Sequence, residues 1–555
     1  MNKFKTLIMA AGAILSIAAC QKNQVEVDGL TANFDLSANP CYAGDEIHFT
    51  STSTGGKKPY VCEWKVGETV LPSKEEEAKY TFAKNGTYQV VLSITDDLGN
   101  TASKKKIVVV NPAPIEDAGG LEMLWVGRME GYNAVSSPAV ADDGSVWCTT
   151  RDEGRLYKFD KDGNKLVDKQ MFEPKNGGKA LGIASIDTDG TVFIGSGEQN
   201  GDAHVIAFNP DGSEKWSFSE WYAKSGDPAP SYRKGVVAIG DKNVYFGCCG
   251  NSGILASADK ATGKRNGFCL PGGGGYTGIA LSKDGYASCY GGMWGFHGVE
   301  TSVLDKGGDS PVQVKYDLWM SDKIQETPKT NPESAIAALT LNGKACFAGQ
   351  VTDQKGTRIY AVCAETGEIL VNHYVEDNSG VQDQGGVVVT PEGYLVAALN
   401  FTSGQDDGGV IMIDPSTADA TGKCEVKGRF KVQEKVAGSA AVDKAGNIHF
   451  GTESGQYYVL DKNFNLIVKT SLAEAVVKKN PTDFTGLEVA KIWSSPTIGD
   501  DGIVYISFTE ANTKAFSGVA AFRPFNRSNT KFCAGLADSE WPMLAHDRRH
   551  TSRQL

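Results

Sequence analysis

Residues 136–160, SSPAVADDGSVWCTTRDEGRLYKFD, carry the pattern that determines the fold of most of this 555-residue chain. Small residues lead into the apolar pair Ala139–Val140, and an Asp143–Gly144 turn follows. Two more apolar segments, Val146–Cys148 and Arg155–Asp160, come after that turn. Two-residue turns need positive φ angles, which glycine adopts without steric cost. The stretch therefore predicts short antiparallel strands joined by tight turns.

The same unit recurs along the chain. The turn glycine returns at Gly144, Gly190, Gly285, Gly343, Gly393, Gly446 and Gly502, and Lys242 takes its place in the remaining copy. Copies lie about 51 residues apart, the length of a four-stranded propeller blade with one loop. We predict an all-β chain with an eight-bladed β-propeller over residues 121–555. Seven blades are the alternative, if the irregular stretch from Gly278 to Asp305 is an insertion.

The two ends of this region predict how the ring closes. Residues 122–126 are typical of a lone fourth strand placed before the first full repeat, and the last repeat ends in an apolar strand at residues 519–522. Pairing the two would remove exposed sheet edges. In the tail, His546 and His550 are spaced as metal ligands on a helix are, but no third ligand is evident. We favour a tail that docks on the ring, and we expect no metal.

The repeats resemble the PQQ-like (quinoprotein-type) β-propeller family, best at residues 258–264 and 363–368, and the tail segment at residues 541–547 is similar to one in such proteins. The resemblance raises the possibility of a PQQ-dependent dehydrogenase, in which Cys248–Cys249 would form a disulfide over the quinone. A strand ending in two small residues is the plainer interpretation. Because no calcium ligand set or catalytic aspartate matches, we expect neither PQQ nor calcium as a cofactor.

Residues 30–111 predict a small β-sandwich, because short period-two strands alternate with turns. The segments 43–49, 63–67, 80–82 and 86–92 resemble the PKD family of Ig-like extracellular modules. One loop departs from that family, with Lys65–Thr69 in place of its usual acidic and glycine-rich sequence. We expect Trp64 in the core, Cys41 and Cys62 as a candidate disulfide, and a stiff linker over residues 112–120.

The N-terminus predicts export. Lys3 and Lys5 precede an apolar run that ends in small residues before Cys20, which is typical of a lipoprotein signal peptide at residues 1–19. Acylation of Cys20 would anchor the mature chain through a tether at residues 20–29. Gln21 in the next position favours the outer membrane, at either the cell surface or the periplasmic face.

Composition narrows the partners. The formal net charge is −12, and nucleic acid binding needs a basic face, so we expect no nucleic acid partner. The connections between repeats are rich in aromatic residues, which hold sugars by their faces. The candidate ligand-binding residues are Trp221, Tyr222, Tyr276, Trp294, Phe296, His297 and Trp319.

The main functional hypothesis is a non-catalytic envelope lipoprotein that captures surface glycans, in a possible complex with an outer-membrane importer. One alternative is a polysaccharide lyase or hydrolase, for which hydrolysis needs two flanking carboxylates. No motif singles out such a pair among the candidate acids Glu198, Asp202, Glu300, Asp377 and Asp383. A lyase for acidic sugars would need cationic residues around its cleft, for which His297 and Arg233 are the candidates. The other alternative is an outer-membrane assembly scaffold.

Overall fold

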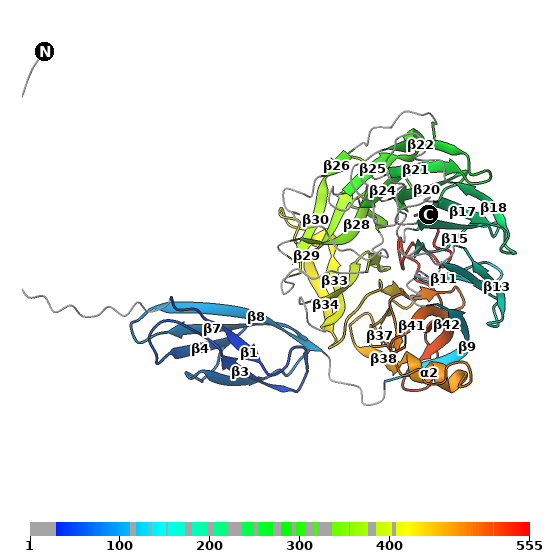
Figure 1. Cartoon of the computed structure of the whole chain (residues 1–555). Coiled ribbons are helices and arrows are strands. Elements are labelled where there is room, and N and C mark those ends of the chain that lie inside the picture. Colours follow the sequence, from blue (N-terminus) through cyan, green and yellow to red (C-terminus); the bar gives the residue numbers. More distant parts are fainter. Residues whose placement is uncertain are drawn as a thin grey trace, which may run out of the picture. The chain divides into compact units, whose positions relative to one another are not determined.

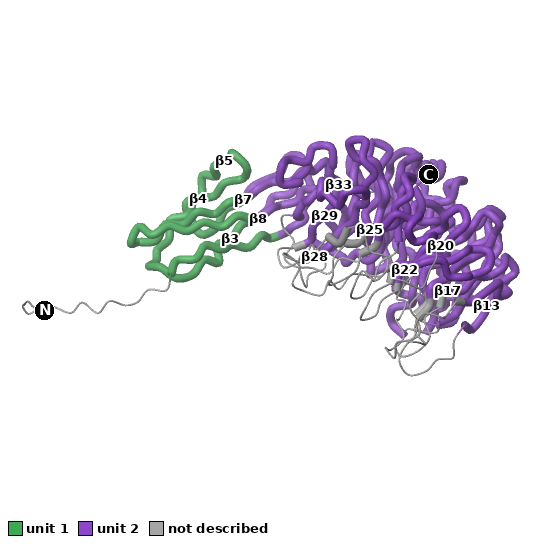
Figure 2. Tube along the Cα trace, turned by 90° about the horizontal axis from the view of Figure 1, so that it is seen from above, with its two compact units in different colours: residues 1–37, 48–79, 90–105 green, residues 38–47, 80–89, 106–555 purple. Residues whose placement is uncertain are grey.

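The computed structural model describes most of the chain after residue 28. The described residues are 29–111, 118–131, 136–150, 154–171, 180–197, 204–218, 236–248, 254–269, 279–290, 296–306, 316–318, 336–353, 356–375, 385–401, 407–513 and 515–554. The chain divides into two compact units, residues 1–37, 48–79 and 90–105 in one and residues 38–47, 80–89 and 106–555 in the other (Figure 2).

The N-terminal strands form two sheets, in the orders β1-β3-β6 and β2-β8-β7-β4-β5. Their bounds are β1 Phe34–Leu36, β2 Cys41–Tyr42, β3 Glu46–Ser51, β4 Val61–Val66, β5 Thr69–Val70, β6 Glu77–Thr81, β7 Gly86–Thr95 and β8 Thr101–Asn111. Exposed and buried residues alternate strictly along β3, so one face of the strand packs inward.

The core of these two sheets is built on Trp64. Its side chain is fully buried and meets Phe34 edge to face at 5.3 Å between ring centroids. The indole Nε1 donates a hydrogen bond to the Glu75 carbonyl at 3.0 Å, which satisfies the one polar group that burial would otherwise leave unpaired. The predicted Ig-like sandwich and the core position of Trp64 are confirmed.

The predicted disulfide between Cys41 and Cys62 is wrong. Both thiols are free and buried. Cys41 lies in β2 and Cys62 in β4, and β8 and β7 run between these strands in the sheet. Three strand steps separate the two residues by about 14 Å, which is about twice the reach of a disulfide between Cα atoms.

The remaining described strands form a β-propeller, in which successive sheets are arranged in a ring (Figure 1). The first four sheets contain β10 Ala139–Val140, β11 Val146–Thr150, β12 Arg155–Phe159 and β13 Lys165–Gln170; β14 Ala180–Leu181, β15 Ser185–Ile186, β16 Val192–Gly197, β17 His204–Phe208 and β18 Glu214–Phe218; β19 Ala238–Ile239, β20 Asn243–Cys248, β21 Ile254–Asp259 and β22 Arg265–Cys269; and β23 Ala280–Leu281, β24 Tyr286–Tyr290, β25 Phe296–Glu300 and β26 Tyr316–Leu318.

The next four sheets complete the series. They contain β27 Ala337–Leu341, β28 Lys344–Asp353, β29 Gly356–Cys363 and β30 Ile369–Tyr374; β31 Val387–Val389, β32 Leu395–Asn400, β33 Gly408–Asp414 and β34 Glu425–Lys431; β35 Ala441–Val442, β36 Ile448–Gly451, β37 Gln456–Leu460 and β38 Leu466–Ser471; and β39 Ala490–Lys491, β40 Thr497–Ile498, β41 Val504–Glu510, β42 Phe516–Phe525 and β9 Gly120–Glu130. The short helices are α1 Thr301–Leu304, η3 Pro415–Thr417 and α2 Leu472–Lys479.

The described residues thus contain eight such sheets in chain order. The stretch 278–305, which the seven-blade alternative treats as an insertion, supplies β23, β24 and β25 of one of them. This arrangement is consistent with eight blades. Within the described ranges, no helix combines the length and the apolar character that crossing a bilayer requires.

The ring closes as the sequence predicts. The N-terminal strand β9 pairs antiparallel with β42, with Trp125 opposite Ala521 and Val126 opposite Ala520. Trp125 also stacks on Phe159 of β12, with ring centroids 5.9 Å apart. The closing strand therefore contributes side chains to the core between the last sheet and the first.

Candidate functional site

The two edges of the propeller differ. In an antiparallel sheet, the turns after the first and third strands lie at one edge, and the connections after the second and fourth strands lie at the other. We call the first the turn edge; its turns between first and second strands are residues 141–145, 187–191, 240–242, 282–285, 342–343, 390–394, 443–447 and 499–503. At Gly144, φ is +78° and the backbone N–H donates to the Ala141 carbonyl at 3.0 Å, so the predicted glycine turn is confirmed there. We call the other edge, where the connections after the second and fourth strands lie, the opposite edge.

The C-terminal tail (residues 526–555) binds the turn edge from inside the ring. Its carbonyl groups accept backbone hydrogen bonds of 2.7–2.9 Å from Val140, Ile186, Ile239, Leu281, Val389 and Val442. Side chains of the tail reach the two remaining first strands, because Glu540 Oε2 accepts from the Thr340 N–H at 2.8 Å and His550 Nε2 lies 3.3 Å from Thr497 Oγ1. The tail therefore contacts the innermost strand of every sheet.

His550 and Asp547 serve this docking. His550 is fully buried, and burial lowers its pKa to about 4. Burial alone would raise the pKa of Asp547, but the nearby His546 ring and hydrogen bonds from Thr551 outweigh that effect and bring it to about 2. His550 Nδ1 lies 3.3 Å from the Ala184 carbonyl oxygen. These contacts confirm the prediction that the tail docks on the ring.

A cleft of about 610 Å³ lies at the turn edge between the tail and the turn after β31. Acidic side chains dominate its polar lining, among them Glu392, Asp538 and Glu540. Glu540 is already engaged, since its two oxygens accept from the Thr340 N–H at 2.8 Å and from Gln554 Nε2 at 2.9 Å. This carboxylate holds the tail in place and is not free to act as a general acid or base.

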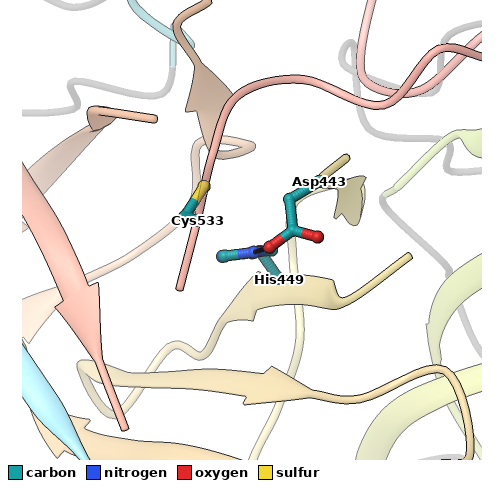
Figure 3. Close-up of side chains that lie close together, drawn as sticks. All are labelled: Asp443, His449 and Cys533. Carbon is teal, nitrogen blue, oxygen red and sulfur yellow. Dashed lines mark hydrogen bonds and ion pairs between the residues drawn. The ribbon is translucent and has the colours of Figure 1, made fainter. Parts of the chain in front are cut away.

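One group of potential metal ligands lies within the described residues, at the same edge. Asp443, His449 and Cys533 bring one ligand atom each to within 4.8 Å of the others (Figure 3). Burial and the charge of Asp443 raise the pKa of the Cys533 thiol to about 12, so it is protonated in the absence of a metal. No sequence motif indicates this group, because Cys533 is far from the other two residues along the chain.

Most predicted ligand-binding residues lie outside the described residues, namely Trp221, Tyr222, Tyr276, Trp294 and Trp319. The residues named for other roles that also lie outside them are Cys20, Cys249, Arg233, Glu198, Asp202, Asp377 and Asp383. Phe296 and His297 are the first residues of β25, and Cys248 and Glu300 end β20 and β25.

Three described strand ends of one sheet meet at the same edge, and one of them is Phe296. β24 ends at Tyr290, β25 begins at Phe296, and the two residues are paired. Leu318, the last residue of β26, is paired with Phe296 on its other side. Residue 276 precedes β23 by a few positions, residue 294 lies between β24 and β25, and residue 319 follows β26. The strand ends Tyr290, Phe296 and Leu318 therefore lie together at the opposite edge, whereas residues 276, 294 and 319 are outside the described ranges.

Comparisons with known proteins agree with the N-terminal domain. The PKD domain family matches residues 31–109, so this part of the chain is a PKD domain. No curated protein matches the chain in sequence.

Solved propellers are similar only at a distance. BamB from Moraxella catarrhalis is 12% identical with a TM-score of 0.45, and the match covers 72% of this chain and 97% of that one. A catalytically inactive virginiamycin B lyase from Staphylococcus aureus, solved with quinupristin, is 12% identical with a TM-score of 0.37, covering 71% and 98%. Likeness of this degree says nothing about the activity of this chain.

Proposed function

We propose that this protein is a non-catalytic carbohydrate-binding propeller of the cell envelope. The observation that supports the proposal is the pairing of Phe296 with Tyr290 and Leu318, three strand ends at the opposite edge. In the sequence, the connections next to these strands carry the aromatic residues Tyr276, Trp294 and Trp319.

Aromatic rings suit a sugar ligand. Tryptophan and tyrosine offer a broad apolar face together with a polar group that can donate a hydrogen bond. Trp294 lies between glycines, in Gly291-Gly292-Met293-Trp294-Gly295, and glycine lets a backbone approach a ligand closely. Such a surface binds the apolar face of a sugar ring without requiring a charged substrate.

The polar groups at the turn edge are already used to hold the tail. His550 is buried against Ala184 and Thr497, and Glu540 bonds to Thr340 and Gln554. A ligand that bound through these groups would have to displace contacts that hold the tail to the ring. We therefore assign binding to the opposite edge.

We propose further that acylation of Cys20 anchors the mature chain in the outer membrane, with residues 20–29 as a tether. The PKD domain would then act as a spacer between the lipid and the propeller. Several acyl chains on one cysteine are needed for stable anchoring, because a single chain gives only marginal binding. Radiolabelled fatty acid should enter the wild-type protein and not a Cys20→Ser variant.

Affinity electrophoresis on gels containing plant, host or microbial polysaccharides tests binding. We expect retention of the wild-type protein on at least one polysaccharide. Trp294→Ala combined with Phe296→Ala should weaken that retention about ten-fold, which corresponds to the loss of about 1.4 kcal/mol. Tyr286→Ala is the matched control, since Tyr286 begins β24 of the same sheet at the turn edge, and it should be retained like the wild type.

Three results would contradict the proposal. The wild-type protein would pass through every gel, the double variant would be retained like the wild type, or reducing ends or unsaturated sugars would accumulate on incubation. The last result would identify an enzyme. Absence of retention together with co-purification of outer-membrane assembly proteins would favour the scaffold hypothesis.

A further inference from the structure

We propose that Asp443, His449 and Cys533 form a zinc site that attaches the C-terminal tail to the sheet β35–β38. Asp443 begins the turn after β35, His449 lies in β36, and Cys533 lies in the tail (Figure 3). This site is at the turn edge and is separate from the surface assigned to carbohydrate.

The donor atoms suit zinc. Zinc prefers thiolate, imidazole and carboxylate ligands, with bonds of about 2.0–2.3 Å. Such bonds leave the ligand atoms roughly 3–4 Å apart. Here Asp443 Oδ2 and His449 Nε2 are 3.1 Å apart, and the sulfur lies within 4.8 Å of both. A small inward movement of the Cys533 side chain completes a three-ligand site.

The backbone already fixes the tail beside the turn. On the C-terminal side of Cys533, the Lys444 N–H donates to the Gly535 carbonyl at 2.9 Å, and the Ala537 N–H donates to the Val442 carbonyl at 3.1 Å. The Cys533 carbonyl also lies so close to Gly502 that a Cβ there would be only 2.0 Å from its oxygen. The cysteine is thus held near its partners before any metal binds.

Outer contacts orient the two buried ligands. His449 Nδ1 lies 3.0 Å from the Tyr457 hydroxyl. Asp443 Oδ1 accepts from the Ala445 and Asn447 N–H groups at 2.9 and 3.0 Å, and Oδ2 accepts from Asn447 Nδ2 at 2.8 Å. Metal-binding histidines ordinarily have such a partner on the second nitrogen, and the partner fixes the ring.

The charges balance on binding. Zinc displaces the Cys533 thiol proton, which passes to solvent. His449 binds as a neutral imidazole through Nε2, so its single proton is on Nδ1 and is donated to the Tyr457 oxygen. One thiolate and one carboxylate neutralise the dication, so no net charge is buried. Cys533 is partly exposed, which gives the ion an entry path and a water molecule the fourth position.

Cobalt(II) titration of the full chain tests the site, because a cobalt–thiolate bond gives a charge-transfer band that oxygen and nitrogen ligands do not. We expect this band in the wild-type protein and its loss in Cys533→Ser. Added zinc should abolish the band by competition and should raise the melting temperature of the wild type, but not of Cys533→Ser.

Cys363→Ser is the matched control. Cys363 is buried, and its sulfur accepts hydrogen bonds at a hairpin turn. Asp259 plays the same role at the corresponding turn of another sheet. A serine oxygen can accept these bonds, so the variant should fold and keep the band. Tyr457→Phe should retain the band and weaken zinc binding about ten-fold.

No band in the folded wild-type protein, or a band that persists in Cys533→Ser, would overturn the zinc site. The first result would leave Asp443 and His449 as a hydrogen-bonded pair that only supports the turn. Retention on polysaccharide gels is measured with and without a chelator, so failure of the zinc site and failure of carbohydrate binding are separate results.

Discussion

The ring is closed at two places, and the closures differ in kind. The outer closure, between β9 and β42, is an antiparallel ladder from Glu130 opposite Phe516 to Gly120 opposite Phe525, with one register shift between Ala521 and Phe522. The inner closure is the C-terminal tail, an irregular segment that bonds to the first strand of each sheet in turn. The outer closure joins only the last sheet to the first, whereas the inner closure ties all of them to one segment.

The inner closure also requires unusual backbone angles. Within residues 541–552 of the tail, four residues other than glycine have positive φ, namely Ala545 at 55°, His546 at 78°, His550 at 56° and Ser552 at 52°. Each such residue costs of order 1 kcal/mol and persists only where its surroundings fix it. Here the fixing contacts are the backbone bonds to Val140, Ile186 and Leu281. The comparison indicates that stability of the ring depends more on the tail than on the closing strand.

The largest expected effect comes from removing the inner closure. A chain that lacks residues 536–555 loses eight backbone hydrogen bonds to the ring at about 1 kcal/mol each, together with the burial of Trp541. This loss is comparable to the whole stability of a domain, which is about 5–15 kcal/mol. We expect the propeller to lose its cooperative thermal unfolding and to become sensitive to proteolysis. An unchanged melting temperature would refute the central role of the tail.

A single tail residue should have the next largest effect. Trp541 is fully buried and meets His546 edge to face at 5.3 Å between ring centroids. Trp541→Ala should cost about 3–5 kcal/mol, measured by chemical denaturation. Trp125→Ala in the outer closure is the matched comparison, and its loss should be smaller because Trp125 is 7% exposed. The reverse order would contradict the comparison.

Acid should weaken the inner closure before the outer one. The pKa of His550 is about 4 in the folded protein, below the ordinary histidine value of 6.5, so the unfolded chain takes up a proton first as the pH falls. Folding stability is therefore full above pH 6.5 and declines toward pH 4, by about 3 kcal/mol. Denaturation midpoints across this range measure the slope. His550→Gln should flatten it, and an equal slope in that variant would assign the effect to other groups.

The smallest effect is expected in the outer closure. A Cβ at Gly127 of β9 would lie 2.4 Å from the Phe159 ring, so Gly127→Ala should cost about 1–3 kcal/mol through overpacking. Adding Phe159→Leu should restore part of this loss by making room. If the double variant is no more stable than Gly127→Ala, the clash with Phe159 is not the cause.

The outer closure was predictable because it depends on local sequence patterns. Strands of period two, glycine turns such as Gly144 and a lone strand at residues 122–126 are each visible in a few neighbouring residues. Docking of the tail was predicted, but its path was not, since no local signal places residues such as Ala545 and His550 at positive φ. Strand order is likewise a long-range property, which is why the Cys41–Cys62 pairing failed.

The candidate sites follow the same division. Asp443, His449 and Cys533 meet only through the docking of the tail, so spacing along the chain cannot reveal them. The carbohydrate positions were chosen by residue type, and the register of β24, β25 and β26 places one of them, Phe296, at the opposite edge. Their role as ligands stays a prediction.

The inner closure has a further consequence for the order of folding. Arg548 bonds to Val140, a residue 408 positions earlier in the chain. Contacts of such long range form slowly, because the intervening chain must be gathered first. During synthesis every sheet is made before the tail emerges, and until then unpaired edges are open to wrong partners. Completion of the ring is thus a late event. This protein should therefore depend on chaperones for longer than a protein whose sheets, each built from strands adjacent in sequence, could fold independently.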